Sequence, residues 1–170
     1  MKKNQKGFSL IELLIVVVII GIIAAIAIPN LLAARRGANE GTAISSLRTL
    51  HGANVTYQAT NGNGKFAPAL VDLSAAGVNL IDSVLSGATT ATTAKSGFVY
   101  AYTTSPTATR PSVFAVISTP SITSGVSATG TRRFGIATDG VIYSEGAAVA
   151  ATMTQATGVL TVGSATALNQ

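Results

Sequence analysis

One uninterrupted apolar run constrains this chain more than any other feature. From Phe8 to Ile28 there are 21 residues with a single ionisable side chain, Glu12. As an α-helix rising about 1.5 Å per residue, this run would extend roughly 31 Å, which matches the hydrocarbon core of a bilayer. The sequence therefore predicts a membrane-spanning helix. A carboxylate inside such a helix is costly enough to require a partner or a function.

Two interpretations of Glu12 follow from its neighbours. Ser9 and Glu12 have the spacing of a capping box, in which the glutamate accepts from the N-cap amide and Phe8 packs on Leu13. Alternatively, cleavage between Gly7 and Phe8 would create an amino group with a pKa of about 7.7 to 8.0. That amine could pair with Glu12 of the same chain or of a neighbouring copy. The residues alone leave both interpretations open.

The leader MKKNQKG and the following FSLIELLIVVVIIGIIAAIAIPN resemble the N-terminus of type IV pilins and type II secretion pseudopilins. This resemblance implies that Gly7 precedes the prepilin peptidase cleavage site and that Phe8 becomes N-methylated. It also implies that Glu12 neutralises the Phe8 amine of an adjacent subunit during assembly. The basic residues that match the family's leader are Lys2, Lys3 and Lys6.

The resemblance implies a structural subunit and not an enzyme. Such a subunit enters the bacterial inner membrane as a precursor, is processed by a prepilin peptidase and N-methyltransferase, and polymerises with copies of itself. Its other expected partners are the lipid bilayer, an inner-membrane assembly platform and a cytoplasmic ATPase, and its product is an extracellular filament. Two alternatives stay open: a major pseudopilin of a type II secretion system, and a monomeric membrane-anchored binding domain.

Charge predicts the orientation. The leader lysines lie directly before the apolar run, so the positive-inside rule places the N-terminus in the cytoplasm and the residues after Pro29 on the far side. Removal of the leader leaves eight basic and six acidic side chains, a net charge of +2 instead of +5. An ordinary signal peptide cleaved near Ala24–Ala27 is the competing interpretation.

The helix is predicted to continue to about Thr60 and to end at Asn61-Gly62-Asn63-Gly64. The expected divisions are a leader (1–7), a membrane-spanning and filament-core segment (8–29), an amphipathic segment (30–61) and a globular head (62–170). In the amphipathic segment, one helical side carries Leu31, Leu32, Ile44, Leu47, Leu50, Val55 and Tyr57, and the polar side carries Arg35, Arg36, Glu40 and Arg48.

Two residues within the apolar run carry further assembly predictions. Gly21 and Ala25 form a small-xxx-small pair that permits close approach of another helix. Pro29 lacks a backbone N–H, so a kink or local unwinding is expected there. In related filaments the segment between these positions melts on assembly, which the resemblance extends to Gly21–Pro29.

The head is predicted to hold one or two short helical turns followed by an antiparallel sheet of three or four strands. Strand signals cover Phe98–Thr103, Val113–Ile117, Arg133–Thr138 and Val141–Ser144, with Asp139-Gly140 as a two-residue hairpin turn. The apolar face of this sheet requires a cover, and the long helix is available. The expected fold class is therefore α+β. Residues 157–162 are expected to form an edge strand or a tail.

Chemistry beyond assembly finds little support in the sequence. There is no cysteine, which excludes disulfides, thiol catalysis and thiolate metal sites. The carboxylates are scattered, Asp139 and Glu145 are too few for a calcium site, and His51 is expected to be a packed or surface residue. Arg110, Arg132 and Arg133 are interpreted as a solvated face, so no nucleic acid, metal or other cofactor is predicted.

Overall fold

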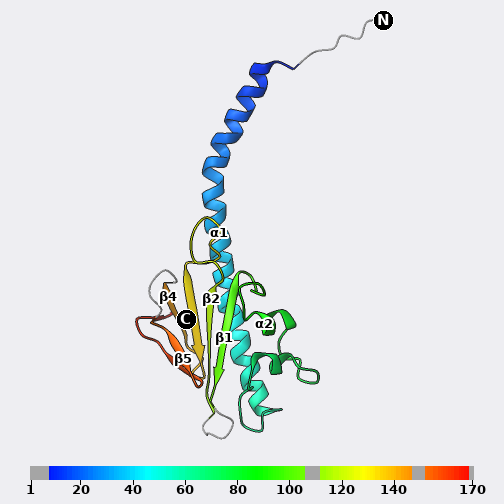
Figure 1. Ribbon diagram of the computed structural model, residues 1–170, viewed down its shortest axis with the longest axis vertical. Coiled ribbons are helices and arrows are strands. Elements are labelled where there is room, and N and C mark those ends of the chain that lie inside the picture. Colours follow the sequence, from blue (N-terminus) through cyan, green and yellow to red (C-terminus); the bar gives the residue numbers. More distant parts are fainter. Residues whose placement is uncertain (1–7, 106–111, 147–151, 169–170) are drawn as a thin grey trace, which may run out of the picture. The chain divides into compact units, whose positions relative to one another are not determined.

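The computed structural model describes residues 8–105, 112–146 and 152–168 (Figure 1). The chain divides into two compact units, one ending at Arg35 and one beginning at Arg36. Helix α1, Leu10–Ala59, contributes to both. The predicted α+β class, with a long N-terminal helix and an antiparallel sheet packed on its second part, is confirmed.

In the first unit, the apolar run is helical and nothing covers it. Among the residues described, this helix is the one long and apolar enough to cross a membrane. Its large apolar side chains from Phe8 to Ile28 are between 49% and 81% exposed. A surface of this kind is unfavourable in water and requires lipid or other helices around it.

The helix is not unwound at Pro29. Pro29 cannot donate a hydrogen bond to the carbonyl of Ala25. At the next position, the Asn30 side-chain amide donates to the Ile26 carbonyl at 3.1 Å. The backbone stays α-helical through this point, so the predicted local unwinding is absent from the single chain. Melting of Gly21–Pro29 during assembly stays a prediction.

The second unit is built on a five-stranded antiparallel sheet in the order β1-β2-β3-β4-β7. The strands are β1 Phe98–Thr104, β2 Phe114–Pro120, β3 Arg132–Ala137, β4 Ile142–Gly146 and β7 Thr166–Ala167. The four strands predicted from sequence are confirmed. The fifth, β7, was not predicted, because two residues are too few to show a period-two pattern.

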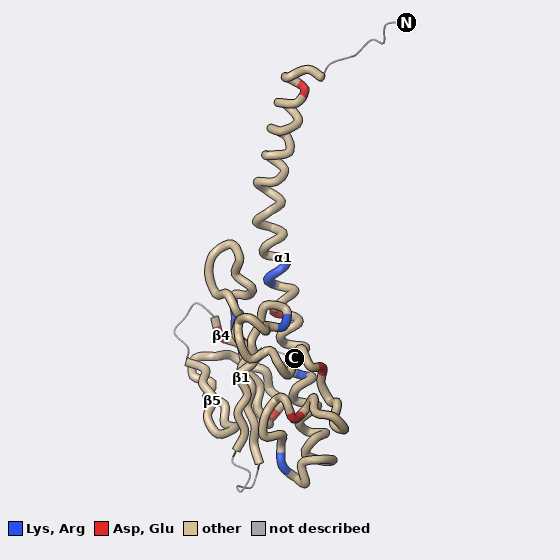
Figure 2. The backbone as a smooth tube through the Cα atoms, turned by 45° about the vertical axis from the view of Figure 1, so that its right-hand side comes forward, with Lys and Arg blue, Asp and Glu red and all other residues tan. Residues whose placement is uncertain are grey.

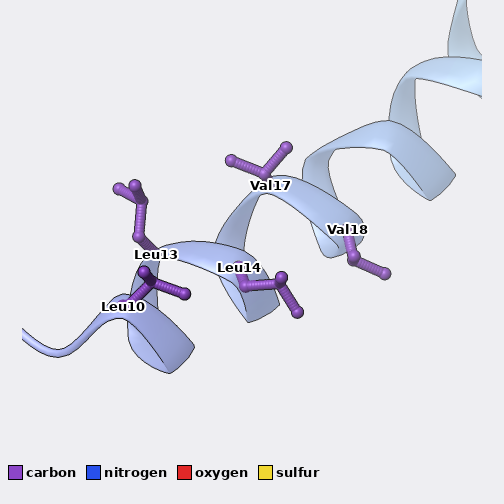
Figure 3. A pocket seen from close by; sticks show the side chains of 5 residues that line it. All are labelled: Leu10, Leu13, Leu14, Val17 and Val18. Atoms are coloured by element: carbon purple, nitrogen blue, oxygen red, sulfur yellow. The ribbon is translucent and has the colours of Figure 1, made fainter.

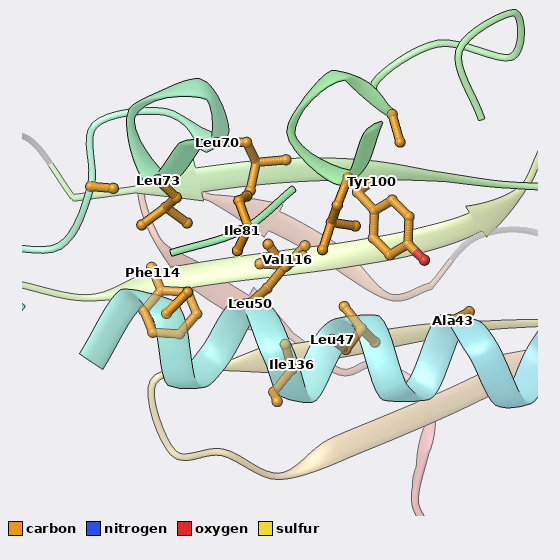
Figure 4. Packing of buried hydrophobic residues seen from close by; sticks show 14 of the residues in the cluster. Ala43, Leu47, Leu50, Leu70, Leu73, Ile81, Tyr100, Phe114, Val116 and Ile136 are labelled. Atoms are coloured by element: carbon orange, nitrogen blue, oxygen red, sulfur yellow. The ribbon is translucent and has the colours of Figure 1, made fainter. Parts of the chain in front are cut away.

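One face of this sheet packs on α1. Residues that share this face include Tyr102, Val116 and Ile136, which lie opposite one another across β1, β2 and β3. Leu47 and Leu50 of α1 are fully buried against them. Figure 4 shows these helix residues meeting the sheet, with Leu70, Leu73 and Ile81 completing the core from the segment before β1.

In the sequence, two short helices follow α1 and precede β1, as predicted. These are the 3-10 helix η1, Leu70–Ser74, and α2, Ser83–Gly87, which Asp82 caps by accepting from the Leu85 amide at 2.8 Å. Directly after α2, the Ala88 carbonyl accepts from the Tyr100 amide at 2.7 Å, which fixes this region to the outer edge of β1.

A separate hairpin covers the opposite face of the sheet. Strands β5, Thr154–Ala156, and β6, Val159–Thr161, pair with each other and contact β1, β2 and β3. The expectation for residues 157–162 is therefore corrected: β6 is neither an edge strand of the main sheet nor a tail. Gly135 permits this packing, since a Cβ there would lie 2.6 Å from the Met153 sulfur.

The predicted hairpin between β3 and β4 exists, but its turn is longer than two residues. The Gly140 amide donates to the Ala137 carbonyl at 3.0 Å, and Gly140 has a φ of +74°. Thr138 and Asp139 occupy the centre of this turn. A two-residue type I′ turn needs positive φ at both central residues, and in this turn only the following glycine supplies it.

Candidate functional site

The N-terminal end of α1 places Glu12 in a local hydrogen bond. Glu12 Oε2 accepts from the backbone amide of Ser9 at 3.0 Å, and the Ser9 carbonyl accepts from the amides of Glu12 and Leu13. This is the glutamate half of the predicted capping box. Phe8 is 81% exposed, so the predicted staple onto Leu13 does not bury it.

The side chains beyond Glu12 form a continuous aliphatic surface. Leu10, Leu13, Leu14, Val17 and Val18 line a shallow apolar hollow on neighbouring turns of α1 (Figure 3). Figure 2 shows no charged segment along α1 between the acidic residue near its start and the arginines that follow the apolar run. The segment can therefore contact lipid or apolar helices along its whole length.

Of the other predicted assembly residues, Gly21 lies on an open surface. A Cβ built on Gly21 meets no atom within 4 Å, which leaves room for a neighbouring helix to approach. The single chain brings Phe8 and Glu12 to the same end of α1 and leaves Gly21 and Pro29 further along it. Gly7 and the leader lysines lie outside the described residues.

Comparison with known proteins also finds similarity in the N-terminal segment. Residues 2–28 match the model of the prokaryotic N-terminal methylation motif. The chain resembles type IV pilins and type II secretion pseudopilins.

Among these relatives, the type IV wide pilus major component PilA4 of Thermus thermophilus is 49% identical over 61 residues, which cover 36% of this chain and 47% of the relative. The type II secretion system core protein G of Aeromonas hydrophila is 37% identical over 60 residues, 35% of this chain and 42% of the relative. The type IV major pilin PilA of Myxococcus xanthus is 46% identical over 54 residues, which cover 32% of this chain and 24% of the relative. The matches thus span less than half of each pilin-like relative, and no solved structure matches the chain.

The second unit contains a carboxylate, Glu40, whose environment was predicted wrongly from the sequence. Glu40 was assigned to the polar side of the helix, but it is buried and joins α1 to the start of β3. Its Oε1 accepts from the Thr131 amide at 2.7 Å and the Thr131 hydroxyl at 2.8 Å, and its Oε2 accepts from Arg132 Nε at 3.0 Å. Burial alone would raise the pKa of Glu40, but these hydrogen bonds lower it below its usual value.

A signal for Glu40 was present in the helical spacing. Glu40, Ala43, Leu47, Leu50 and Asn54 recur at intervals of three and four and are all buried. This regular repeat places the glutamate and the asparagine on the core side of α1. The buried Asn54 is satisfied by donating to the Leu50 carbonyl and by accepting from the Tyr102 hydroxyl at 2.9 Å.

Arg133 and Glu145 form a buried ion pair across β3 and β4. Arg133 Nε and Nη2 both donate to Glu145 Oε2. The prediction that Arg133 lies on a solvated face is therefore wrong. Arg132 is likewise paired with Glu40, and Arg110 lies outside the described residues. The Arg132 side chain is 48% exposed, so the predicted solvated face holds for Arg132 and fails for the buried Arg133.

Glu145 also holds the base of the β5–β6 hairpin. Its carboxylate accepts from the Thr152 amide at 3.0 Å, the Met153 amide at 3.1 Å and the Ser164 hydroxyl at 3.3 Å. Burial would raise the pKa of Glu145, but hydrogen bonds from Thr152 and Arg133 outweigh burial and lower it to about 2. The carboxylate therefore organises the C-terminal cover of the sheet.

His51 has a packing role, as predicted. Its ring lies 5.7 Å from the Phe114 ring and its Nε2 lies 3.4 Å from the Thr138 carbonyl oxygen. Within the described ranges, no three His, Asp or Glu side chains gather into a candidate metal site. The segment with a distinct chemical surface is thus the N-terminal part of α1.

Proposed function

We propose that this chain is the structural subunit of a type IV pilus-like helical filament. The observation that carries the proposal is the methylation motif of residues 2–28 at the head of an apolar helix that is exposed on all sides. In water this surface would drive association, and in a filament core copies of the same helix would cover it. The similarity to a type IV wide pilus component supports the same function.

In this proposal the leader, residues 1–7, stays cytoplasmic until a prepilin peptidase cleaves after Gly7 and methylates Phe8. Residues 8–29 first span the inner membrane, then leave it for the filament core. Transfer from lipid to equally apolar helices costs little, so helix packing and pairing of Glu12 with the Phe8 amine of a neighbour bias the exchange. Residues 30–61 and 62–170 form the outward-facing part. The chain acts as a structural component, and we assign no catalytic residue.

A second function has its own support. The chain is similar to a type II secretion system core protein G, so the same segment would instead build a short periplasmic pseudopilus for protein export. Both functions would involve the same kind of processing, and each would require an inner-membrane assembly platform and a cytoplasmic ATPase of its own. They differ in the length and location of the filament.

Electron microscopy and mass spectrometry of sheared surface material test the proposal together. We expect long fibres whose subunit mass begins at a methylated Phe8. Short assemblies confined to the envelope, with the same processed terminus, would favour the pseudopilus. A chain that keeps Met1 and never assembles would contradict both.

A further inference from the structure

The connection between β2 and β3, here called the 121–131 loop, is fixed to the second unit at its base. The Thr129 amide donates to the Ile122 carbonyl at 2.9 Å, and the Thr129 hydroxyl donates to the Gly97 carbonyl at 2.7 Å. From α1, Asn39 Nδ2 donates to the Thr129 carbonyl at 3.0 Å. The loop is therefore an ordered part of the head, and Figure 1 shows it extending past the ends of β2 and β3.

The tip of this loop is a closed turn that presents an aliphatic side chain. The Ala128 amide donates to the Gly125 carbonyl at 3.2 Å, so Val126 occupies a central position of the turn, where it is 80% exposed. Ile122, closer to the base, is 44% exposed. No Asp, Glu, Lys or Arg occurs from residue 121 to residue 131. The tip can therefore enter an apolar depression without burying a charge.

The second unit also contains an open hollow of about 210 Å³ with an apolar lining. Val159, which directly follows the β5–β6 turn, is 56% exposed in it. Gly158 of that turn packs so closely on Val113 that a Cβ on Gly158 would collide with the Val113 carbonyl. The apolar side chains that line the hollow are Val113, Ala137, Val159 and Leu160. The hollow is therefore a defined feature of the head that an aliphatic side chain can occupy.

The loop and the hollow lie at opposite ends of the same two strands. The loop begins directly after β2, whereas Val113 directly precedes β2 and Ala137 ends β3. The seven residues of β2 separate the two ends by about 23 Å. Two copies joined tip to hollow still have one unused tip and one unused hollow. Such a heterologous contact adds copies in one direction and gives an open filament unless its rotation closes a ring.

Hydrogen-bonding groups at the tip and in the hollow are also complementary. Asp139 lines the hollow, and its Oδ1 accepts from the Val141 amide at 3.1 Å. Among the residues that the structure describes, Asp139 Oδ2 has no partner, and the Val126 and Ser127 amides at the tip have none either. The tip thus offers donors and the hollow offers an acceptor. Their pairing would offset the loss of hydration when the two surfaces meet.

We propose that, in the assembled filament, the 121–131 loop of one copy inserts Val126 into the hollow beside Val159 of the next copy. This contact rests on the proposed self-assembly through residues 8–29 and adds a second contact, between the heads. A weak contact is sufficient, because the helical segments already hold the copies at a high effective concentration. Burial of the two valines then stabilises the assembled state.

The experiment uses the absence of cysteine from the chain. Val126→Cys and Val159→Cys are combined in one chain, and filaments sheared from cells that make this variant are oxidised with copper phenanthroline. The two thiols of one chain lie at opposite ends of the sheet, too far apart for a disulfide. We expect a ladder of linked dimers, trimers and larger species, with at least fivefold more linked chain than in the control. The matched control combines Val159→Cys with Val84→Cys, at a site 59% exposed on α2.

Variants with one cysteine test the direction of the contact. Filaments that contain a mixture of Val126→Cys chains and Val159→Cys chains should give dimers and nothing larger, since each chain has a single thiol. Dimers formed by Val126→Cys alone, or by Val159→Cys alone, would indicate a contact between like surfaces and would overturn the proposal.

Val126→Asp tests the contact without cross-linking, because it places a second carboxylate beside Asp139. We expect its filaments to release at least twofold more subunits than wild type at a fixed urea concentration, and Val84→Asp filaments to match wild type. Equal release by all three would overturn the contact. Filaments that form normally without linkage above the control would overturn it and leave the proposed function intact. Failure of the wild-type chain to form any assembly would overturn the proposed function and the contact together.

Discussion

Glu12 Oε2 and the backbone nitrogen of Ser9 lie 3.0 Å apart in a hydrogen bond at the start of α1. A carboxylate has two oxygens with about four lone-pair sites, so this single bond leaves capacity for a cation. The local cap and an intermolecular pair with the Phe8 amine are therefore compatible. We propose that the two sequence-based interpretations of Glu12 are successive uses of one side chain.

Two substitutions at Glu12 separate these uses. Glu12→Gln keeps an acceptor for the Ser9 amide and removes the charge, whereas Glu12→Ala removes both. We expect both variants to insert into the membrane and to enter filaments at least tenfold less than wild type, a difference of about 1.4 kcal/mol. Quantitative mass spectrometry of co-assembled filaments measures this ratio. Incorporation of Glu12→Gln at the wild-type level would reduce Glu12 to its capping role.

Acid should weaken the second unit through Glu145. Its pKa is about 2 in the folded chain and 4.5 as its ordinary value, so its contribution to stability is present above about pH 4.5 and is lost as pH falls toward 2. At pH 7, Glu145→Gln leaves Arg133 buried without its counterion and should cost about 3 kcal/mol. Denaturant unfolding of detergent-solubilised protein at pH 7 and pH 3 tests this. A difference between variant and wild type that does not shrink at pH 3 would rule out this linkage.

Gly135 should tolerate a methyl group poorly. A Cβ at this position would lie 2.6 Å from Met153 Sδ and 3.2 Å from Leu160, so Gly135→Ala should destabilise the chain by about 1–3 kcal/mol. Gly52→Ala is the control, because a Cβ on this exposed helical glycine meets nothing within 4 Å and should stabilise by about 0.5–1 kcal/mol. Chemical denaturation compares the two. Equal effects would mean that the β5–β6 hairpin does not pack on Gly135.

Tyr102→Phe should lower the stability of the second unit, because it removes a hydroxyl that pairs with a buried side chain of the core. Tyr102 donates to Asn54 Oδ1 at 2.9 Å and lies 2.7 Å from the Ala67 carbonyl oxygen. Loss of the hydroxyl leaves the oxygen of a fully buried asparagine unpaired, which costs about 1–3 kcal/mol. Asn54→Leu in the same background should recover part of that loss, since it removes the unpaired group. A double-mutant cycle monitored by thermal unfolding tests the coupling, and additive effects would contradict it.

The local patterns in the sequence predicted most of the framework. The apolar run defined α1, and period-two alternation at Phe98, Tyr100 and Tyr102 defined β1, because both signals depend on neighbours in the chain. Glu40 was misplaced although its helical spacing groups it with core residues, because its residue type was given more weight than its spacing. Its burial depends on Thr131 and Arg132, about 90 residues away, and residue type alone favours exposure for a glutamate.

The C-terminal cover shows the same limit more strongly. Strands of two or three residues rich in alanine and threonine carry no periodic signal, and Glu145 gave no sign that it binds Thr152 and Ser164. Arg133 and Glu145 face each other because of the β3–β4 register, which the predicted two-residue turn would have shifted by one residue, and their shared burial requires the hairpin above them. Because the burial of each of these elements depends on the others, the local sequence of one element does not predict it.

The β5–β6 hairpin and β7 follow the other strands in the sequence, so the sheet is completed late in synthesis. The outer face of the sheet is closed by β5 and β6, and its edge by β7, whose neighbour Leu168 donates to the Ile142 carbonyl at 2.8 Å. All three strands follow β1–β4 in the sequence, so the ribosome makes them later. Until residues 152–168 emerge, Ala115 and Ile117 face solvent, and the nascent head is open to wrong partners. A ribosome that stalls in this region would deliver a chain whose sheet lacks its cover, with an apolar face open to aggregation.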